Sequence, residues 1–291
     1  MGAALFAGGV GELTDRFDGF IVDQWSVIHD GQRLYPAATG VLAELKARGK
    51  RIVLLSNSGR RAAFNRKRLA EMGLDLGLLD AVVTSGEAAW QALRRRAGPP
   101  FDTLGRRCLL FTIGGDLGVV DGLGLELVDD PERADFVFAT GLEIPPRTLD
   151  DYRRLVEPAA ARGVPMICSN PDKVAPVGDR LAISPGTIAQ VYEELGGSVR
   201  YIGKPYQPIY AACFEALADI PRPRIVAIGD SMEHDVKGAN DAGIAACFVL
   251  GGIHAADFPA GAGRVEHAGE VEQLALRYGA RPDLVLERFV W

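Results

Sequence analysis

The stretch "GFIVDQWSVIHDG", residues 19–31, begins with an apolar run that ends abruptly at a carboxylate. The run Phe20-Ile21-Val22 is typical of a buried strand, which would place Asp23 at its carboxyl end. If Asp23 is a nucleophile, a proton donor for the leaving group is expected two residues later, where the next side chain on the same side would lie. Trp25 occupies that position and cannot usefully donate a proton. The stretch therefore indicates either an enzyme without its acid or a carboxylate that does no chemistry.

Short apolar runs recur along the chain, and each ends in a small or polar residue before a helical pattern begins. They are "RIVLLSNSG" (51–59), "AVVTSG" (81–86), "RCLLFTIGG" (107–115), "FVFATG" (136–141), "PMICSN" (165–170), "VRYIGKP" (199–205) and "RIVAIGDS" (224–231). The helical patterns cover 61–72, 86–96, 148–162, 186–195, 207–218 and 235–242. This alternation predicts an α/β fold of βαβ units around a parallel sheet that is covered on both faces. In such sheets the ligand site lies beyond the carboxyl ends of the strands.

Composition narrows the class of protein. The chain has 291 residues, 48% hydrophobic content and a net charge of −6, which argues against a nucleic-acid partner because phosphate binding needs a basic face. No run reaches the ~20 apolar residues of a membrane span, and the N-terminal stretch lacks the basic region of a signal peptide. The four cysteines are scattered without a Cys-x-x-Cys pair, which favours free thiols. We therefore expect a cytoplasmic protein.

Polar residues end four of the predicted strands or follow them closely. They are Asp23, Ser56, Lys204 and Asp230, with Asp235 five residues after the last. Three carboxylates beside one lysine would repel one another, and a divalent cation would resolve this repulsion. Oxygen ligands suit Mg²⁺. Metal, lysine and hydroxyl together would form a receptor for a phosphate, and an aspartate between them would suit in-line attack.

Each of these residues, taken alone, also has a simpler interpretation. Asp23 could end a strand in a turn, and Ser56 could cap a helix. Lys204 could be a solvated loop residue, and Asp235 could cap a helix over 236–242. Their joint occurrence at strand ends favours the phosphate receptor.

At these residues the sequence resembles the haloacid dehalogenase superfamily of phosphohydrolases over nearly the whole chain. Its first motif resembles "GFIVDQWSVIHDG", with Asp23 as nucleophile, and its second resembles "IVLLSNSGR", with Ser56 as phosphate ligand. Its third resembles "YIGKPYQPIY", with Lys204, and its fourth "IVAIGDSMEHDVKGANDAGI", with Asp230 as metal ligand and Asp235 behind it. The greatest similarity is to class IIA, the nitrophenylphosphatase-like group.

Class IIA members have a large α/β cap between the second and third motifs. The resemblance therefore implies a hydrolase core over 1–84 and 199–291 and a cap over 85–198. Within that cap, "CSNPDK" resembles the family's Asn-Pro-Asp segment, with Asn170 and Asp172 facing the substrate. A proline turn is the simpler alternative for this segment.

The first motif departs from the family at one position. Phosphatases of the family have Asp-x-Asp there, and the second Asp protonates the leaving group and later activates water. Trp25 replaces it, while the family's metal contact at this position is only the backbone carbonyl. Such an acid contributes about 10²–10⁴-fold to the rate. His29, Asp30 and His234 are candidates to replace it. The large aromatic Trp25 could instead stack on a substrate ring or exclude water, or it could simply pack between core and cap.

The sequence and the resemblance together predict an Mg²⁺-dependent phosphohydrolase that acts on a small phosphorylated metabolite through an aspartyl-phosphate. The expected roles are nucleophile for Asp23, metal ligands for Asp23, Asp230 and the Trp25 carbonyl with Asp235 in support, and phosphate ligands for Ser56, Asn57 and Lys204. Two alternatives stay open: a non-catalytic phosphometabolite binder or regulator, and another reaction of the superfamily. The substrate is not determined, and the protein could form a homo-oligomer.

Overall fold

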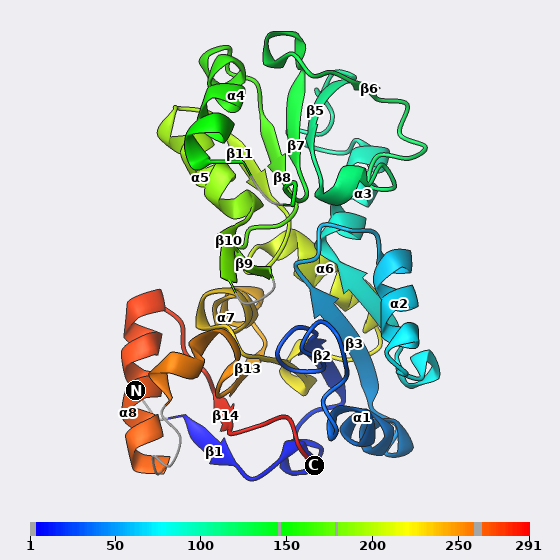
Figure 1. Cartoon of the computed structure of the whole chain (residues 1–291). Helices are drawn as coiled ribbons and strands as arrows, with labels where there is room; N and C mark the ends of the chain where they lie inside the picture. Colours follow the sequence, from blue (N-terminus) through cyan, green and yellow to red (C-terminus); the bar gives the residue numbers. More distant parts are fainter. Residues whose placement is uncertain (1–3, 145–146, 178–179, 259–263) are drawn as a thin grey trace. The chain divides into compact units, whose positions relative to one another are not determined.

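The protein folds into two compact units, each with its own parallel sheet (Figure 1). The computed structural model describes residues 4–144, 147–177, 180–258 and 264–291. Unit 1 comprises Met1–Ser56, Arg66–Val83 and Lys204–Trp291, and unit 2 comprises Asn57–Asn65 and Thr84–Gly203.

Unit 1 contains a seven-stranded sheet in which every described pairing is parallel. In spatial order its strands are β1 (Leu5–Ala7), β14 (Leu284–Leu286), β13 (Ala245–Val249), β12 (Ile225–Gly229), β2 (Gly19–Asp23), β3 (Arg51–Ser56) and β4 (Ala81–Thr84). The helices that accompany them are α1 (Ala38–Ala47), α2 (Ala62–Glu71), α6 (Gln207–Ala216), α7 (Lys237–Ala242) and α8 (Arg264–Tyr278). The predicted α/β fold with a parallel sheet is confirmed.

Apolar side chains cover both faces of this sheet and form two separate cores. Phe20 and Val22 of β2 belong to the core that includes α1, whereas Ile21 belongs to the core that includes α6 and α7. Since successive side chains of a strand point to opposite faces, Asp23 shares the face of Ile21. The strand pattern alone thus directs the Asp23 carboxylate toward the side of the sheet where α6 and α7 pack.

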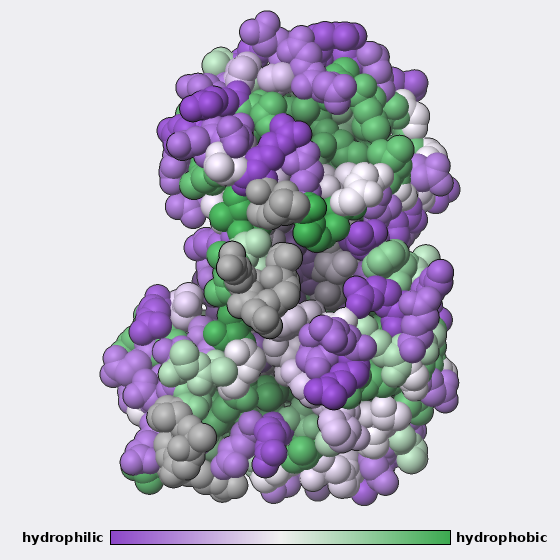
Figure 2. Space-filling view, viewed as in Figure 1, coloured by the Kyte–Doolittle hydropathy of each residue, from purple (hydrophilic) through white to green (hydrophobic). Residues whose placement is uncertain are grey.

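Unit 2 contains a five-stranded parallel sheet and a separate antiparallel pair. The sheet order is β11 (Val199–Tyr201), β8 (Met166–Cys168), β7 (Phe136–Ala139), β5 (Arg107–Phe111) and β6 (Glu126–Leu127), and the pair is β9 (Val174–Val177) with β10 (Arg180–Ile183). Helices α4 (Leu149–Ala161) and α5 (Pro185–Glu194) pack on one face of the sheet, and α3 (Ser85–Arg95) packs on the other. Figure 2 shows apolar side chains gathered over the part of this unit where Figure 1 labels β5 and β6.

Short 3₁₀ and π turns complete the chain: η1 (Val10–Leu13), η2 (Leu76–Leu78), η3 (Ile113–Gly115), η4 (Pro131–Arg133), η5 (Arg222–Arg224), the π-helical η6 (Met232–Val236) and η7 (Gly252–Asp257). No described helix is both long and apolar enough to cross a lipid bilayer.

The helix expected over 235–242 differs from the prediction. Its first turn is the π-helical η6, and α7 begins only at Lys237. The interpretation of Asp235 as a helix cap is wrong, because the Ser231 hydroxyl caps η6 by accepting from the His234 N–H at 3.1 Å. Hydrogen bonds of a π turn close one residue later than those of an α-helix. The Asp235 carboxylate accepts from the Ser231 N–H, four residues back along the chain.

The strands expected within the proposed cap, β5 and β7, lie in the sheet of unit 2 and not in the sheet that contains Asp23. The assignment of 85–198 as a cap stays a prediction. Sequence patterns also missed several elements, namely β1, β9, β10, β13, β14, α1 and α8. Strands β1 and β14 are three residues long, and β13 begins with two alanines, so none of the three gives a strong strand signal.

Candidate active site

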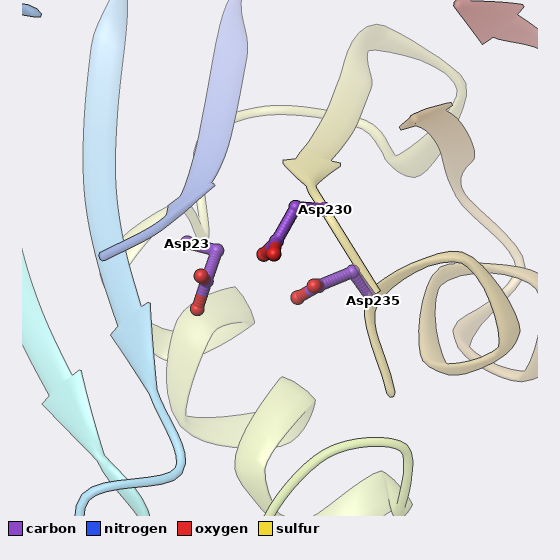
Figure 3. A group of neighbouring side chains, drawn as sticks. All are labelled: Asp23, Asp230 and Asp235. Atoms are coloured by element: carbon purple, nitrogen blue, oxygen red, sulfur yellow. The ribbon is translucent and has the colours of Figure 1, made fainter. Parts of the chain in front are cut away.

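Three buried carboxylates and one buried ammonium meet at the carboxyl end of the unit 1 sheet. Oxygen atoms of Asp23, Asp230 and Asp235 all lie within 4.8 Å of one another. Figure 3 shows the three side chains pointing toward a common centre. The Lys204 Nζ donates to Asp23 Oδ1 at 2.5 Å and to Asp235 Oδ1 at 2.7 Å. The structure therefore brings together four residues that are far apart in the sequence.

Strand pairing explains why two of these carboxylates meet. Asp23 is the last residue of β2, and Asp230 directly follows β12. These strands are parallel neighbours in which Val22 pairs with Ile228. Parallel neighbours end at the same edge of a sheet, so Asp23, one residue after Val22, and Asp230, two residues after Ile228, both lie at this edge.

Asp235 reaches the same place from η6, and two contacts hold its carboxylate. The Ser231 N–H donates to Asp235 Oδ2 at 3.0 Å, while Oδ1 accepts from Lys204. Gly229 provides the space: a Cβ at this position would lie 2.1 Å from the Asp235 Cγ. With both oxygens hydrogen-bonded, Asp235 is suited to hold Lys204 and support the cluster.

A loop that sequence analysis missed holds the third carboxylate. The Ile253 N–H donates to Asp230 Oδ2 at 2.8 Å. Gly252 has a φ of 53° and lies so close that a Cβ there would stand 1.8 Å from Asp230 Oδ2. His254 follows Ile253, and its Nε2 accepts from the Met232 N–H at 3.2 Å. This bond joins the loop to η6. The only signal of this loop in the sequence was the Gly251-Gly252 pair.

The cluster carries more negative than positive charge, and the pKa values reflect this. Burial raises the pKa of Asp23 well above its usual value, and the charges of Asp235 and Asp230 raise it further against the opposing effect of Lys204. Burial and Asp235 raise the pKa of Asp230 to about 7. Burial alone would lower the pKa of Lys204, but the charges of Asp23 and Asp235 keep it well above its usual value.

The four residues fit a divalent cation on their own chemistry. Three ionised carboxylates and one ammonium leave two negative charges in a buried site, which is costly unless a cation compensates them. All the candidate ligand atoms are carboxylate oxygens, the preference of Mg²⁺ and other hard cations. The geometry thus favours a metal centre, and the identity of the metal stays a prediction.

The predicted phosphate ligands are divided between the two units. Ser56 ends β3, one residue beyond Leu55, the pairing partner of Asp23. Asn57 follows Ser56 in the chain but belongs to unit 2, where its Nδ2 donates to Asp172 Oδ1 at 2.7 Å. The Asp172 N–H in turn donates to Asn170 Oδ1 at 3.0 Å. That Asn170 and Asp172 face the substrate stays a prediction.

Trp25 lies outside β2, and its side chain is 44% exposed. A Cβ built on Gly31 would lie 3.0 Å from the Trp25 Nε1, so the indole lies against this glycine. The backbone between them turns sharply at Ser26, whose φ is 66°. The expectation that strand geometry continues through residue 25 is therefore wrong: the strand ends at Asp23 and the following turn sets the direction of the indole.

The three candidate replacement acids are engaged in other contacts. The buried His29 accepts from the Gly31 N–H at 3.0 Å through Nδ1, and burial lowers its pKa. The exposed Asp30 accepts from the N–H groups of Gln32 and Arg33, and these bonds lower its pKa. His234 Nδ1 lies 3.0 Å from the Ser231 hydroxyl. These contacts give none of the three a visible role as the missing acid.

The close approach of Gly252 to Asp230 yields a test of the metal centre. Mg²⁺ at a hundredfold excess over its dissociation constant should stabilise the parent protein by about 2.7 kcal/mol. This stabilisation would appear as an increase in melting temperature. We expect Gly252→Ala to abolish the increase, because the added methyl group would displace the Asp230 carboxylate. Gly279→Ala is the matched control: Gly279 has a φ of 58° but no atom within 4 Å of its Cβ position. An undiminished Mg²⁺ effect in Gly252→Ala would contradict the assignment.

The pKa of Asp230 predicts how this stabilisation depends on pH. Without metal, the folded state raises the pKa from 3.8 to about 7, so protonation contributes stability that is complete below pH 3.8 and lost as the pH rises through 7. Mg²⁺ has to displace that proton. We therefore expect the Mg²⁺-induced rise in melting temperature to be larger at pH 8 than at pH 6, measured by differential scanning fluorimetry. Equal rises at both pH values would argue against Asp230 as a ligand.

Comparison with known proteins places this geometry in a family. The haloacid dehalogenase-like hydrolase family matches residues 20–126, and a second HAD-hydrolase-like family matches residues 201–289. The sugar-phosphatase AraL of Bacillus subtilis is 28% identical over 245 residues, which cover 80% of this chain and 83% of AraL.

Solved structures agree. The crystal structure of a haloacid dehalogenase-like hydrolase from Brucella suis 1330 is 32% identical and has a TM-score of 0.81. The match covers 98% of this chain and 100% of that one. The 4-nitrophenylphosphatase of Thermotoga maritima is 26% identical with a TM-score of 0.71, covering 95% of this chain and 96% of that one. The chain therefore belongs to the haloacid dehalogenase superfamily and, within it, to the class IIA, nitrophenylphosphatase-like hydrolases.

Proposed function

We propose that the protein is an Mg²⁺-dependent phosphohydrolase that acts on a small phosphorylated metabolite through an aspartyl-phosphate. The observation that supports this most strongly is the Lys204 bridge between Asp23 and Asp235, beside Asp230. A buried nucleophile is thereby paired with a cation that can also attract phosphate. The relatives agree with this class of substrate, since AraL is named a sugar-phosphatase.

In this proposal the residues of the chain divide the reaction into two displacements. The Asp23 carboxylate attacks phosphorus while the bond from phosphorus to the leaving oxygen breaks, and the leaving group takes the bonding electrons. Water then attacks the same phosphorus, which releases inorganic phosphate and restores the Asp23 carboxylate. Since Lys204 engages Asp23 Oδ1, the other oxygen is the attacking atom. When bound between Asp23, Asp230 and the Trp25 carbonyl, Mg²⁺ would neutralise charge on the phosphoryl oxygens.

The phosphate would be held by Ser56, Asn57 and Lys204, and segment 85–198 would serve as the cap. The bond from the Asn57 amide to Asp172 supports both assignments, because it fixes the residue after Ser56 to the segment that contains Asn170.

A non-catalytic phosphate binder is the second candidate function, and Trp25 is the observation that favours it. The receptor would be kept while the acid is lost. Phosphate binding with no turnover of any substrate, including those with good leaving groups, would support this candidate.

The first test replaces the nucleophile. We expect Asp23→Asn to abolish Mg²⁺-dependent phosphate release from acetyl phosphate, because an amide oxygen is a poor nucleophile. Asp219→Asn, at a surface aspartate whose side chain is 65% exposed and pairs with Arg51, should retain the parent rate. Release of phosphate by a folded Asp23→Asn protein at the parent rate would refute the proposed nucleophile.

The second test restores the acid. We expect Trp25→Asp to increase turnover of an alkyl phosphate by up to about 10²–10⁴-fold, because its leaving group needs a proton. An aryl phosphate should gain less. The 44% exposure of Trp25 makes a large loss of packing energy unexpected, and the backbone carbonyl remains in place. A folded, Mg²⁺-binding variant without a selective gain on alkyl substrates would contradict the assigned role of position 25.

A further inference from the structure

The loop of residues 24–35 closes on itself immediately after the nucleophile. Isolated bridges join Trp25 to His29 and His29 to Leu34. The Ser26 N–H donates to the His29 carbonyl at 2.9 Å, and the Tyr35 N–H donates to the Ile28 carbonyl at 2.9 Å. The loop is thus a cross-linked structure, and its backbone fixes where Trp25 emerges.

The indole of Trp25 packs against Gly31, whose backbone makes two hydrogen bonds. The Gly31 N–H donates to His29 Nδ1 at 3.0 Å, and the Gly31 carbonyl accepts from Arg68 Nη2 at 2.6 Å. Gly31 has a φ of 90°, and its missing side chain lets the indole approach. Trp25 is therefore supported from beneath while 44% of it stays exposed. An aromatic ring fixed in this way loses little entropy when a ligand covers it.

The loop begins beside the acidic cluster. Asp23 is the last residue of β2 and belongs to that cluster, and Trp25 follows it by only two residues. The exposed indole thus emerges from the backbone directly after the proposed nucleophile.

The missing acid restricts the leaving group independently of the indole. An alkoxide is about as basic as hydroxide, and it leaves slowly unless it is protonated. A phenolate, with a conjugate acid of pKa about 10, leaves far more readily as the anion. A site without an acid at position 25 therefore suits an aromatic oxygen as the leaving group.

From these two observations we propose that Trp25 is a stacking platform for the leaving group, and that the substrate is a phosphate monoester of an aromatic hydroxyl. This inference rests on the proposed phosphohydrolase function. The phosphoryl group transfers to Asp23 as above, and the aromatic leaving group departs with the bonding electrons of the broken phosphorus–oxygen bond and takes its proton from water. The aromatic ring of the substrate stacks on the indole of Trp25. The indole donates no proton, and its contribution to the reaction is binding energy.

Four substrates separate the two parts of this proposal. Phenyl phosphate has a ring and a good leaving group, acetyl phosphate has only the good leaving group, benzyl phosphate has only the ring, and glycerol phosphate has neither. We expect the parent protein to turn over phenyl and acetyl phosphate at least tenfold faster than the other two. Benzyl phosphate turned over as fast as phenyl phosphate would overturn the argument from the leaving group.

Substitution of Trp25 tests the platform. We expect Trp25→Leu to raise the KM for phenyl phosphate about tenfold and to leave the KM for acetyl phosphate within twofold, while Trp25→Phe retains most of the preference. Trp291→Leu is the matched control, because this indole is also 40% exposed and lies against a glycine, Gly11, but outside the 24–35 loop. An equal change for both substrates in Trp25→Leu would show a structural role and overturn the platform.

Binding without turnover distinguishes this inference from the proposed function. In an Asp23→Asn background, phenylphosphonate should bind more tightly than inorganic phosphate by calorimetry, and Trp25→Leu should remove the difference. If that difference is present but no substrate is hydrolysed, the platform stands and the phosphohydrolase proposal fails. If hydrolysis occurs and the difference is absent, the phosphohydrolase stands and the platform fails.

Discussion

The Lys204 ammonium, shared between the carboxylates of Asp23 and Asp235, is the interaction on which the site depends. All three groups are buried, and a buried charge without a partner is strongly destabilising. Lys204 follows β11 and precedes α6, whereas Asp23 ends β2 and Asp235 lies in η6. A single side chain therefore joins three separate parts of unit 1, and its charge opposes the rise in the pKa of Asp23 that burial causes.

This interaction does not balance the cluster. Asp230 adds a third carboxylate, and burial together with the charge of Asp235 raises its pKa. Evolution seldom keeps such a concentration of like charge for stability, since an apolar core of the same volume would fold more readily. Strongly perturbed carboxylates at the carboxyl edge of a parallel sheet are typical of functional sites. Gly229 and Gly252 support the assignment as a functional site, because each leaves space that a carboxylate fills.

In the proposed function, Trp25 changes what the site can do without changing how the charged cluster is built. The cluster contains three carboxylates and one lysine. The 24–35 loop presents an indole on Gly31 at the position where the resemblance implies an acid. A phosphoryl-transfer site depends mainly on positioning and charge neutralisation. Under this proposal, an indole at position 25 would narrow the set of leaving groups and would not remove the capacity for transfer.

The sequence by itself determined the parallel α/β fold, the strands that end in Asp23 and Ser56, the strand that Asp230 follows, and the family. These features follow from local patterns: a continuous apolar run, the polar residue after it and short motifs that contain the site residues. The three-residue strands β1 and β14 were not predicted, because so few residues show no periodicity.

Only the tertiary structure decided how the site is held. The bond from Ile253 to Asp230 spans 23 residues and that from Asn57 to Asp172 spans 115, and no local pattern encodes either of them. The π turn that aims Asp235 and the turn at Ser26 that lays Trp25 on Gly31 are likewise outcomes of packing. Side-chain direction depends on the backbone conformation of one or two residues and on the space that distant elements leave. A sequence names the groups of an active site more readily than it places them.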